Sequence, residues 1–420
     1  MKRKKILGLG LLLFCLFGIS PLYGAEVEDI QTKEQEEQIL EYQLNFFNWQ
    51  GIEEMEKSLK ETMPTLESFD LKQEVQSLIK GEKSFSLDYL IKKIGSSLFQ
   101  ELGVFIRLGA RFILIVLLCN LLQTLSSSFE SKGTTQISFF VCYLVIIYSV
   151  MQSLLVMVDL ASRTISGMNQ VMTACIPTLI AFMTTSGYGS SGYAMAPVIS
   201  SALTLSTYFL QKLVLPSIIS VILLQLISTM SDSFKIDKLI DLFYRLMKWV
   251  LRGVLIVAIG VLSVYKATLP YVDMTVKKAA ISVSKTFIPI VGDAVGGAVD
   301  FMMNCSFLVK NSFCIGVMLL VISLVSIPLI KILAYCLIYH VAGAVIEPLG
   351  DKRMASLATH LAKGCEFIMS TVGVVAILCL FVLVICMGVG TQRLEVSDER
   401  VFTNADMGHA LCACGRNDFP

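Results

Sequence analysis

The chain has 420 residues, of which 55% are hydrophobic and 16% are charged, and its mean hydropathy is +0.72. These values lie outside the range of soluble globular domains and exclude a purely soluble protein. The formal net charge of +1 excludes the global basic field that would point to nucleic acid as a partner. We therefore expect an all-α, polytopic integral membrane protein whose solvent is the lipid bilayer of the cell membrane.

The chain begins with a pattern that is typical of an export signal. Residues 1–25 combine a basic start, Lys2 to Lys5, with an apolar run that is short for a membrane span. Tyr23 precedes Gly24 where a cleavage site prefers a small residue, so a cleaved signal peptide and an uncleaved N-terminal anchor both stay open. With either one, we expect the following segment to be exported.

Residues 26–101 form an acidic segment, with 17 acidic and 8 basic residues and with apolar residues at helical spacing. The spacing of Ile52, Met55 and Leu59 is typical of an amphipathic helix, and Pro64 and Gly81 are natural breaks. We predict an extracytoplasmic helical segment with two or three amphipathic helices. Its acidic surface either serves solubility alone or docks a partner outside the cytoplasm.

Residues 102–391 alternate apolar runs with short polar stretches, which is the pattern of a transmembrane domain. A helix needs about 20 apolar residues to cross a bilayer, so several runs are long enough to span it. We predict six to eight spans, and the short runs 171–185 and 332–346 are candidates for re-entrant, broken or tilted helices. The apolar runs are 102–125, 137–158, 171–185, 193–211, 213–230, 249–265, 311–330, 332–346 and 367–390.

Two parts of this domain, about 171–265 and 283–390, share an order of short motifs that suggests an internal repeat. In the first, CIP leads to a glycine-rich stretch, then FLQK, then DKLIDLFYRLMK; in the second, FIP leads to VGDAVGGA, then FLVK, then DKRMASLATHLAK. Proline- and glycine-interrupted segments at corresponding places of two repeats often line a cavity or pack two halves together. The intervals between the motifs differ, so a true duplication and a chance likeness both stay open.

The second glycine-rich stretch, FIPIVGDAVGGAVD at 287–300, combines small and acidic residues. Gly292 and Gly296 would let a neighbouring backbone approach closely, and Asp293 and Asp300 lie seven residues apart on one helical face. The alternative is an interfacial helix whose aspartates are solvated. The candidate helix-packing or pore-lining residues are Pro177, Pro289, Gly292, Asp293, Gly296, Gly297, Asp300 and Lys310.

Catalytic motifs are weak in this sequence. GSSG at 189–192 offers Ser191 as a nucleophile with His340 as its base, but a short Gly/Ser pattern in a polar turn arises easily by chance. The three histidines are scattered, and HExxH, Walker A and CxxC patterns are absent from the sequence. We therefore expect no enzyme activity, no cofactor and no metal, and we interpret the cysteines of the apolar runs as small hydrophobic residues.

Several long stretches together resemble the stage III sporulation protein AE family. They are FIPIVGDAVGGAVD, SFLVKNSF at Ser306–Phe313, and PLIKILAYCLIYHVAGAVIEPLGDKR at Pro328–Arg353, and the likeness covers roughly residues 30–390. The tail 392–420 departs from the family pattern, and a disordered extension and an altered reading frame both stay open for it.

The resemblance implies a membrane component of a sporulation channel or secretion-like complex that links mother cell and forespore. Its implied partners are the other membrane proteins of the stage III sporulation A complex and, directly or indirectly, stage II sporulation protein Q. The implied location is the mother-cell-derived outer forespore membrane, and the implied role is support of late forespore gene expression. The alternative from the residues themselves is a small-solute transporter built on two repeats.

Overall fold

The computed structural model describes residues 49–63, 69–80, 110, 113–118, 121, 132–230, 237–287, 292–349 and 352–388. The predicted export signal 1–25 and the tail 392–420 lie outside the described residues, as do much of the acidic segment and most of the run 102–125.

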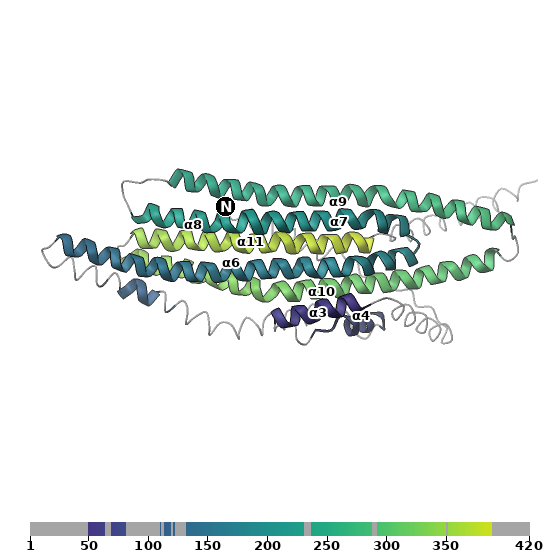
Figure 1. Cartoon of the computed structure of the whole chain (residues 1–420), viewed down its shortest axis with the longest axis horizontal. Coiled ribbons are helices and arrows are strands. Elements are labelled where there is room, and N and C mark those ends of the chain that lie inside the picture. Colours follow the sequence, from purple (N-terminus) through teal and green to yellow (C-terminus); the bar gives the residue numbers. More distant parts are fainter. Residues whose placement is uncertain are drawn as a thin grey trace, which may run out of the picture. The chain divides into compact units, whose positions relative to one another are not determined.

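Every regular element among the described residues is a helix, which confirms the all-α fold class. Two short helices come from the acidic segment, and long helices make up the rest (Figure 1). The elements are α3 Gln50–Thr62, α4 Leu71–Ile79, α6 Lys132–Thr185, α7 Gly189–Phe209, the π-helix η2 Leu210–Val214, α8 Leu215–Met230, α9 Asp237–Phe287, α10 Gly292–Ile346, the 3-10 turn η3 Glu347–Leu349 and α11 Lys352–Gly388.

Five helices in the described ranges are long and apolar enough to cross a membrane, which makes this a multi-pass membrane protein. They are Tyr143–Thr185, Gly189–Ser228, Lys238–Ala267, Phe301–Ile346 and Ala355–Gly388. We predicted six to eight spans; in three of these helices two predicted runs lie in one continuous helix, joined by residues 159–170, by Lys212 and by Lys331. The 55 residues of α10 extend over about 82 Å at 1.5 Å per residue, so α10 is much longer than a hydrocarbon core of about 30 Å.

The run 171–185 is not re-entrant or broken, because α6 continues through Pro177 to Thr185. Proline is tolerated inside transmembrane helices where neighbouring groups satisfy the freed carbonyl. The chain reverses ten residues later, where Gly187 has φ 79° and Tyr188 donates its N–H to Met183 O at 2.8 Å. This pair of features is the Schellman ending of a helix, which favours glycine at the left-handed position.

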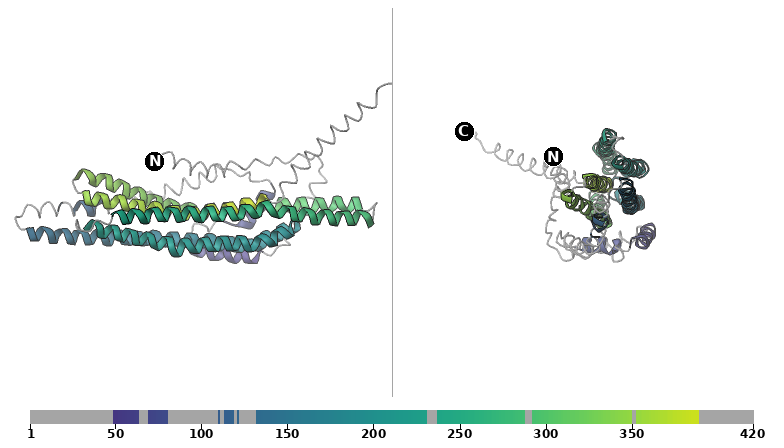
Figure 2. Two further views of the ribbon diagram at one scale, coloured as in Figure 1. Left: turned by 90° about the horizontal axis from the view of Figure 1, so that it is seen from above. Right: turned by 90° about the vertical axis from the view of Figure 1, so that its left-hand side faces the viewer.

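The run 332–346 is likewise continuous with the apolar run before it, since α10 passes through Pro328 and ends at Ile346. Successive long helices are antiparallel, with α6, α9 and α11 running one way and α7–α8 and α10 the other (Figure 1). The view along the helices in Figure 2 (right panel) shows them side by side as a bundle. Helix α10 packs along α11 and against α6, and α10 and α11 are the most buried of the candidate spans.

Helices α3 and α4 pack their apolar sides on α6 and α10. Ile52, Met55 and Leu59 of α3 are buried, as their spacing predicted. Leu59 Cδ2 lies 3.4 Å from where a Cβ of Gly167 in α6 would stand. The amphipathic pattern of the acidic segment therefore covers part of the long helices.

The contact of α4 with α10 is closer still. A Cβ on Gly316 would stand 2.9 Å from Val75 Cγ2 and 3.0 Å from Leu71 Cδ1, so the absence of a side chain there lets α4 approach. Nearby, the ring of Trp49 meets the ring of Phe313 edge-on, with centroids 5.8 Å apart. Asp70 caps α4 by accepting from the Gln73 N–H at 3.1 Å, which fixes where the helix begins.

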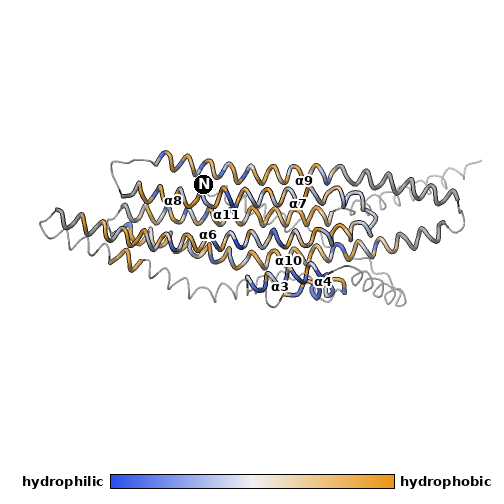
Figure 3. Tube along the Cα trace, in the orientation of Figure 1, coloured by the Kyte–Doolittle hydropathy of each residue, from blue (hydrophilic) through white to orange (hydrophobic). Residues whose placement is uncertain are grey.

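Large exposed apolar side chains lie on several of the long helices. They occur within 137–156 of α6, 193–227 of α7, η2 and α8, 239–265 of α9 and 301–345 of α10, while polar residues gather on α3 and α4 (Figure 3). Exposed apolar surface of this extent requires lipid or another protein to cover it.

The two possible repeats share an order of elements in the structure. In each, a glycine opens a long helix, Gly189 for α7 and Gly292 for α10, and a DK motif opens the next, at Asp237 for α9 and at Lys352 for α11. The corresponding lysines differ, since Lys212 is exposed and Lys310 is fully buried. The duplication itself stays a prediction.

Candidate functional site

One face of α6 changes from apolar to polar at Asp159. Before it, Leu144, Val145 and Val156 are exposed; after it, the exposed face carries polar residues at three- and four-residue spacing. This spacing places them on one side of the helix. The polar residues are Asp159, Arg163, Ser166, Gln170 and Thr173, and we call this stretch the polar face of α6.

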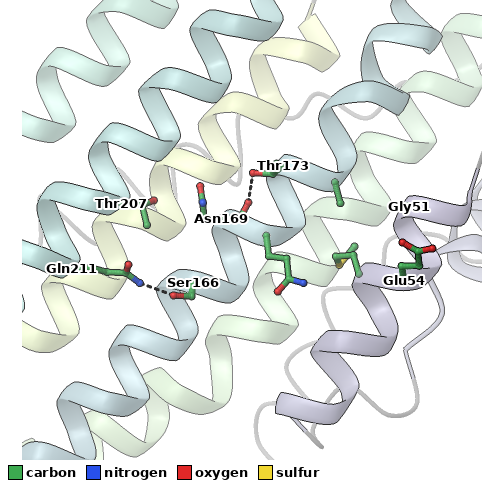
Figure 4. A pocket seen from close by; sticks show the side chains of 10 residues that line it. Gly51, Glu54, Ser166, Asn169, Thr173, Thr207 and Gln211 are labelled. Carbon is green, nitrogen blue, oxygen red and sulfur yellow. Dashed lines mark hydrogen bonds between the residues drawn. The ribbon is translucent and has the colours of Figure 1, made fainter.

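The polar face of α6 forms one wall of a groove of about 560 Å³ (Figure 4). Helix α3 supplies the second wall, and the end of α7 with η2 supplies the third. The lining residues are Gly51, Glu54, Met55, Ser166, Asn169, Gln170, Thr173, Ala174, Thr207 and Gln211.

Gln211 joins the two membrane helices at the groove. Its Nε2 donates to Ser162 O at 2.9 Å and to Ser166 Oγ at 2.8 Å. Gln211 lies in the π-helix η2, whose wider turn is closed by the Leu215 N–H donating to Leu210 O five residues back. Pro216 follows and has no N–H to donate, and π-turns of this kind are frequent at functional sites.

Asn169 places its amide at the groove. Its Oδ1 is buried and has no hydrogen-bond partner within the described ranges, while Thr173 Oγ1 donates to the Asn169 carbonyl at 2.8 Å. A buried amide oxygen costs free energy unless it is hydrogen-bonded, so Asn169 Oδ1 is expected to accept from an ordered water or another polar donor. The groove thus offers amides and hydroxyls, with the exposed Glu54 carboxylate on the α3 side.

Lys310, a predicted candidate residue, is fully buried in α10. Its Nζ lies 3.4 Å from Met387 O of α11 and 4.6 Å from the centroid of the Phe307 ring. A carbonyl and an aromatic face are both partners for an ammonium group, which is costly to bury without them. The structure therefore places Lys310 in the α10–α11 contact.

The other predicted candidates are distributed between two helices. Pro177 is exposed inside α6. Gly292, Asp293, Gly296, Gly297 and Asp300 lie in the first three turns of α10, where the backbone is described and the side chains are not; Pro289 lies outside the described residues. The structure does not bring Pro177 and the glycine-rich stretch into one described site, and the role of these residues stays a prediction.

Ser191 and His340 are placed on different helices. Ser191 is buried in the first turn of α7, whereas the Nε2 of His340 on α10 lies 3.4 Å from Glu366 Oε1 of α11. Cys336, four residues before His340, completes a cluster whose ligand atoms lie within 4.8 Å of one another. We expected no metal from the scattered histidines; the four-residue spacing of Cys336 and His340 was the signal in the sequence, while Glu366 joins them only in three dimensions.

The polar groove was also missed by the sequence analysis. Ser166 and Gln170 lie between the apolar runs 137–158 and 171–185, and Thr173 lies at the start of the second run. Their three- and four-residue spacing was the signal that one helix continues with a polar face.

Comparison with known proteins places this architecture in a family. The family model for stage III sporulation protein AE matches residues 69–390. The stage III sporulation protein AE of Bacillus subtilis (strain 168) is 28% identical over 304 residues, which cover 72% of this chain and 76% of that protein. No solved structure matches the chain. The chain therefore belongs to the stage III sporulation protein AE family of sporulation proteins.

Proposed function

We propose that this protein is a membrane component of a channel or secretion-like complex that links the mother cell and the forespore during sporulation. The observation that carries the proposal is the polar groove on α6, a helix whose exposed side chains before Asp159 are mainly apolar. A conduit through a membrane needs polar side chains that line water, and such residues rarely face lipid. In the assembled complex the polar face of α6, which α3 of the exported segment covers, would line the extracytoplasmic part of the conduit, and the protein itself would catalyse no reaction.

The partners we propose are the other membrane proteins of the stage III sporulation A complex and, directly or through them, stage II sporulation protein Q. The exposed apolar residues of α6, α9 and α10 support this proposal, because such a surface can bind other membrane helices as well as lipid. The proposed location is the mother-cell-derived outer forespore membrane. Copurification of these proteins from membranes of sporulating cells tests the assembly.

A direct test replaces polar groups of the groove without changing their size. Thr173→Val and Asn169→Leu should lower spore yield and late forespore gene expression while the protein accumulates normally in the membrane. Thr184→Val is the matched control, since Thr184 is also exposed on α6 and its Oγ1 also donates to a carbonyl four residues back, Ile180 O at 2.9 Å. Thr184 lies outside the groove lining. Normal spore yield in both groove variants would contradict the conduit role.

The proposed orientation rests on export of the acidic segment. If that segment is exported, the end of the bundle that α3 and α4 cover is extracytoplasmic, and the connection 231–236 is cytoplasmic. The positive-inside rule does not select this orientation, because Lys235 and Lys238 precede the span 249–265 while Lys277 and Lys278 follow it. A reporter active only in the cytoplasm should be silent when fused after Glu82 and active when inserted after Asp232. The opposite pair of results would reverse the orientation.

The second candidate function is transport of a small polar solute. The groove volume of about 560 Å³ favours it, because small-molecule sites usually enclose about 300–1,000 Å³. Solute flux through the purified chain, reconstituted alone, would support the transporter. Solute flux that requires the partner proteins, and sporulation that requires them, would instead support the proposal that this chain is a component of a channel complex.

A further inference from the structure

We propose that Cys336, His340 and Glu366 form a zinc-binding site between α10 and α11. The sulfur, imidazole nitrogen and carboxylate oxygen of these residues all lie within 4.8 Å of one another, and His340 Nε2 is 3.4 Å from Glu366 Oε1. Three different ligand types converge there from two helices. The site lies outside the groove on α6, and the inference is independent of the proposed channel.

The helical geometry explains why the three ligands meet. Cys336 and His340 are four residues apart in α10 and so lie one above the other on the same face. This face is turned to α11, since Cys336 Sγ lies 3.6 Å from Ala362 O. The helices approach closely one turn further on, where a Cβ at Gly343 would stand 3.6 Å from Ala355 O. Glu366, one turn after Ala362, is then within reach of both.

The ligand set selects the metal. Thiolate ligands favour zinc and copper(I), imidazole suits zinc, and a carboxylate disfavours the softest ions, so Zn²⁺ satisfies all three. Three protein ligands leave the fourth tetrahedral position for water, as in zinc sites that are open. Access exists because the side chains of His340 and Glu366 are 47% and 36% exposed, whereas Cys336 is buried.

The charge balance also favours a divalent cation. Zn²⁺ with one thiolate and one carboxylate is formally neutral, and His340 contributes a neutral ring. Neutrality matters here because the exposed neighbours of His340 on α10, Leu337 and Val341, are apolar, and charge beside hydrocarbon is costly. On binding, the Cys336 thiol gives its proton to solvent, its sulfur lone pair forms the Zn–S bond, and no electron is transferred.

The test measures Zn²⁺ binding to the purified full chain in detergent, by competition with a fluorescent zinc indicator. Cys412→Ala and Cys414→Ala are introduced throughout so that the CxC of the tail does not bind the ion. The parent chain should bind one Zn²⁺. Changing a group that only supports a ligand costs about 10–100-fold in metal affinity, so Cys336→Ala, His340→Gln and Glu366→Gln should each lose at least about 100-fold.

Cys379→Ala is the matched control, because Cys379 is a buried cysteine of α11 outside the cluster, and its affinity should equal that of the parent. Co²⁺ supplies a second readout: it should give the near-ultraviolet thiolate-to-metal band in the parent and the control, and lose it in Cys336→Ala. The proposal is overturned if the parent binds no zinc saturably, or if folded Glu366→Gln and Cys336→Ala bind as the parent does. The His340–Glu366 contact would then be a simple hydrogen-bonded pair.

Discussion

Helices α10 and α9 are both membrane helices of about fifty residues, yet they differ in what surrounds them. In the most apolar stretch of α10, 61% of the residues are buried inside the protein, against 22% in α9. Helix α10 touches α11, α6 and α4 and encloses Lys310, whereas α9 exposes Trp249, Ile256 and Val257. Two membrane helices of similar length therefore differ in burial: α10 is held by the chain itself, and α9 offers its surface to lipid or to partners.

The largest effect is expected from a charge change at corresponding lysines of the two possible repeats, Lys310 of α10 and Lys212 of η2. Lys310→Glu would bury a carboxylate beside the Met387 carbonyl and the Phe307 ring, and an unpaired buried charge costs about 3–5 kcal/mol. Lys212→Glu changes an exposed residue and should stay within about 0.5 kcal/mol. Thermal unfolding in detergent and membrane abundance measure both.

Lys310→Met separates the charge from the packing at the same position. Methionine keeps the length of the apolar stem, and replacement of a buried charge by an apolar side chain is often neutral or stabilising. We therefore expect an unfolding temperature equal to or above that of the wild type. Equal loss of stability in the Met and Glu variants would show that the ammonium group itself holds α10 to α11.

A second prediction concerns two glycines of α11. A Cβ at Gly364 would overlap the Ile222 side chain of α8, while at Gly373 nothing among the described residues lies within 4 Å of that position. Gly364→Leu should therefore lower stability by about 1–3 kcal/mol through overpacking, and Gly373→Leu should change it little. The ratio of folded to aggregated protein after heating gives the comparison, and similar losses in both would contradict the α8–α11 packing.

The third prediction compares a valine-to-alanine change, which removes two methyl groups, at a buried position of α10 and at an exposed position of α9. Val321 is fully buried and Val257 is 65% exposed, so Val321→Ala should cost about 1–2 kcal/mol and Val257→Ala almost nothing. Spore yield then tests whether a partner protein or lipid covers the exposed side of α9. If the exposed side of α9 contacts a partner, Val257→Leu should reduce sporulation without altering the stability of the isolated protein; unaltered yield would indicate that lipid covers this side.

The smallest expected effect concerns Glu56, which joins α3 to α4 by accepting from the Leu71 N–H at 2.8 Å. Burial raises the pKa of the Glu56 carboxyl above 4.5, although this hydrogen bond and Lys60 oppose the shift. The folded state therefore prefers the protonated acid, and its contribution to stability is lost as the pH rises from about 4.5 through the raised pKa.

Glu56→Gln should make the stability independent of pH in the range where Glu56 titrates, because the amide oxygen still accepts from the Leu71 N–H and carries no charge. Hydrogen exchange of the α3–α4 backbone amides at several pH values measures this stability, and Glu53→Gln is the control for net charge. A slope in Glu56→Gln as steep as in the wild type would exclude Glu56 as its source.

Local patterns in the sequence were enough to predict the helices and their location in a membrane. The hydropathy of the long runs, the spacing of Ile52, Met55 and Leu59, and the motifs between Phe287 and Arg353 each depend on residues close together in the chain. Helical periodicity and transfer into lipid act over such short separations, so the all-α membrane fold and the family followed from the order of residues.

The tertiary structure decided which face of each helix is inside. Nothing near Lys310 in the sequence distinguishes it from Lys212, because burial depends on α11, which lies far along the chain. The groove requires α3 and η2 to meet the polar face of α6, and Glu366 contacts His340 although it lies 26 residues later in the chain. In a bilayer a long helix can be apolar on several sides, so hydrophobicity alone does not show which of its faces is inside, and close packing at small residues such as Gly316 and Gly364 helps to select that face.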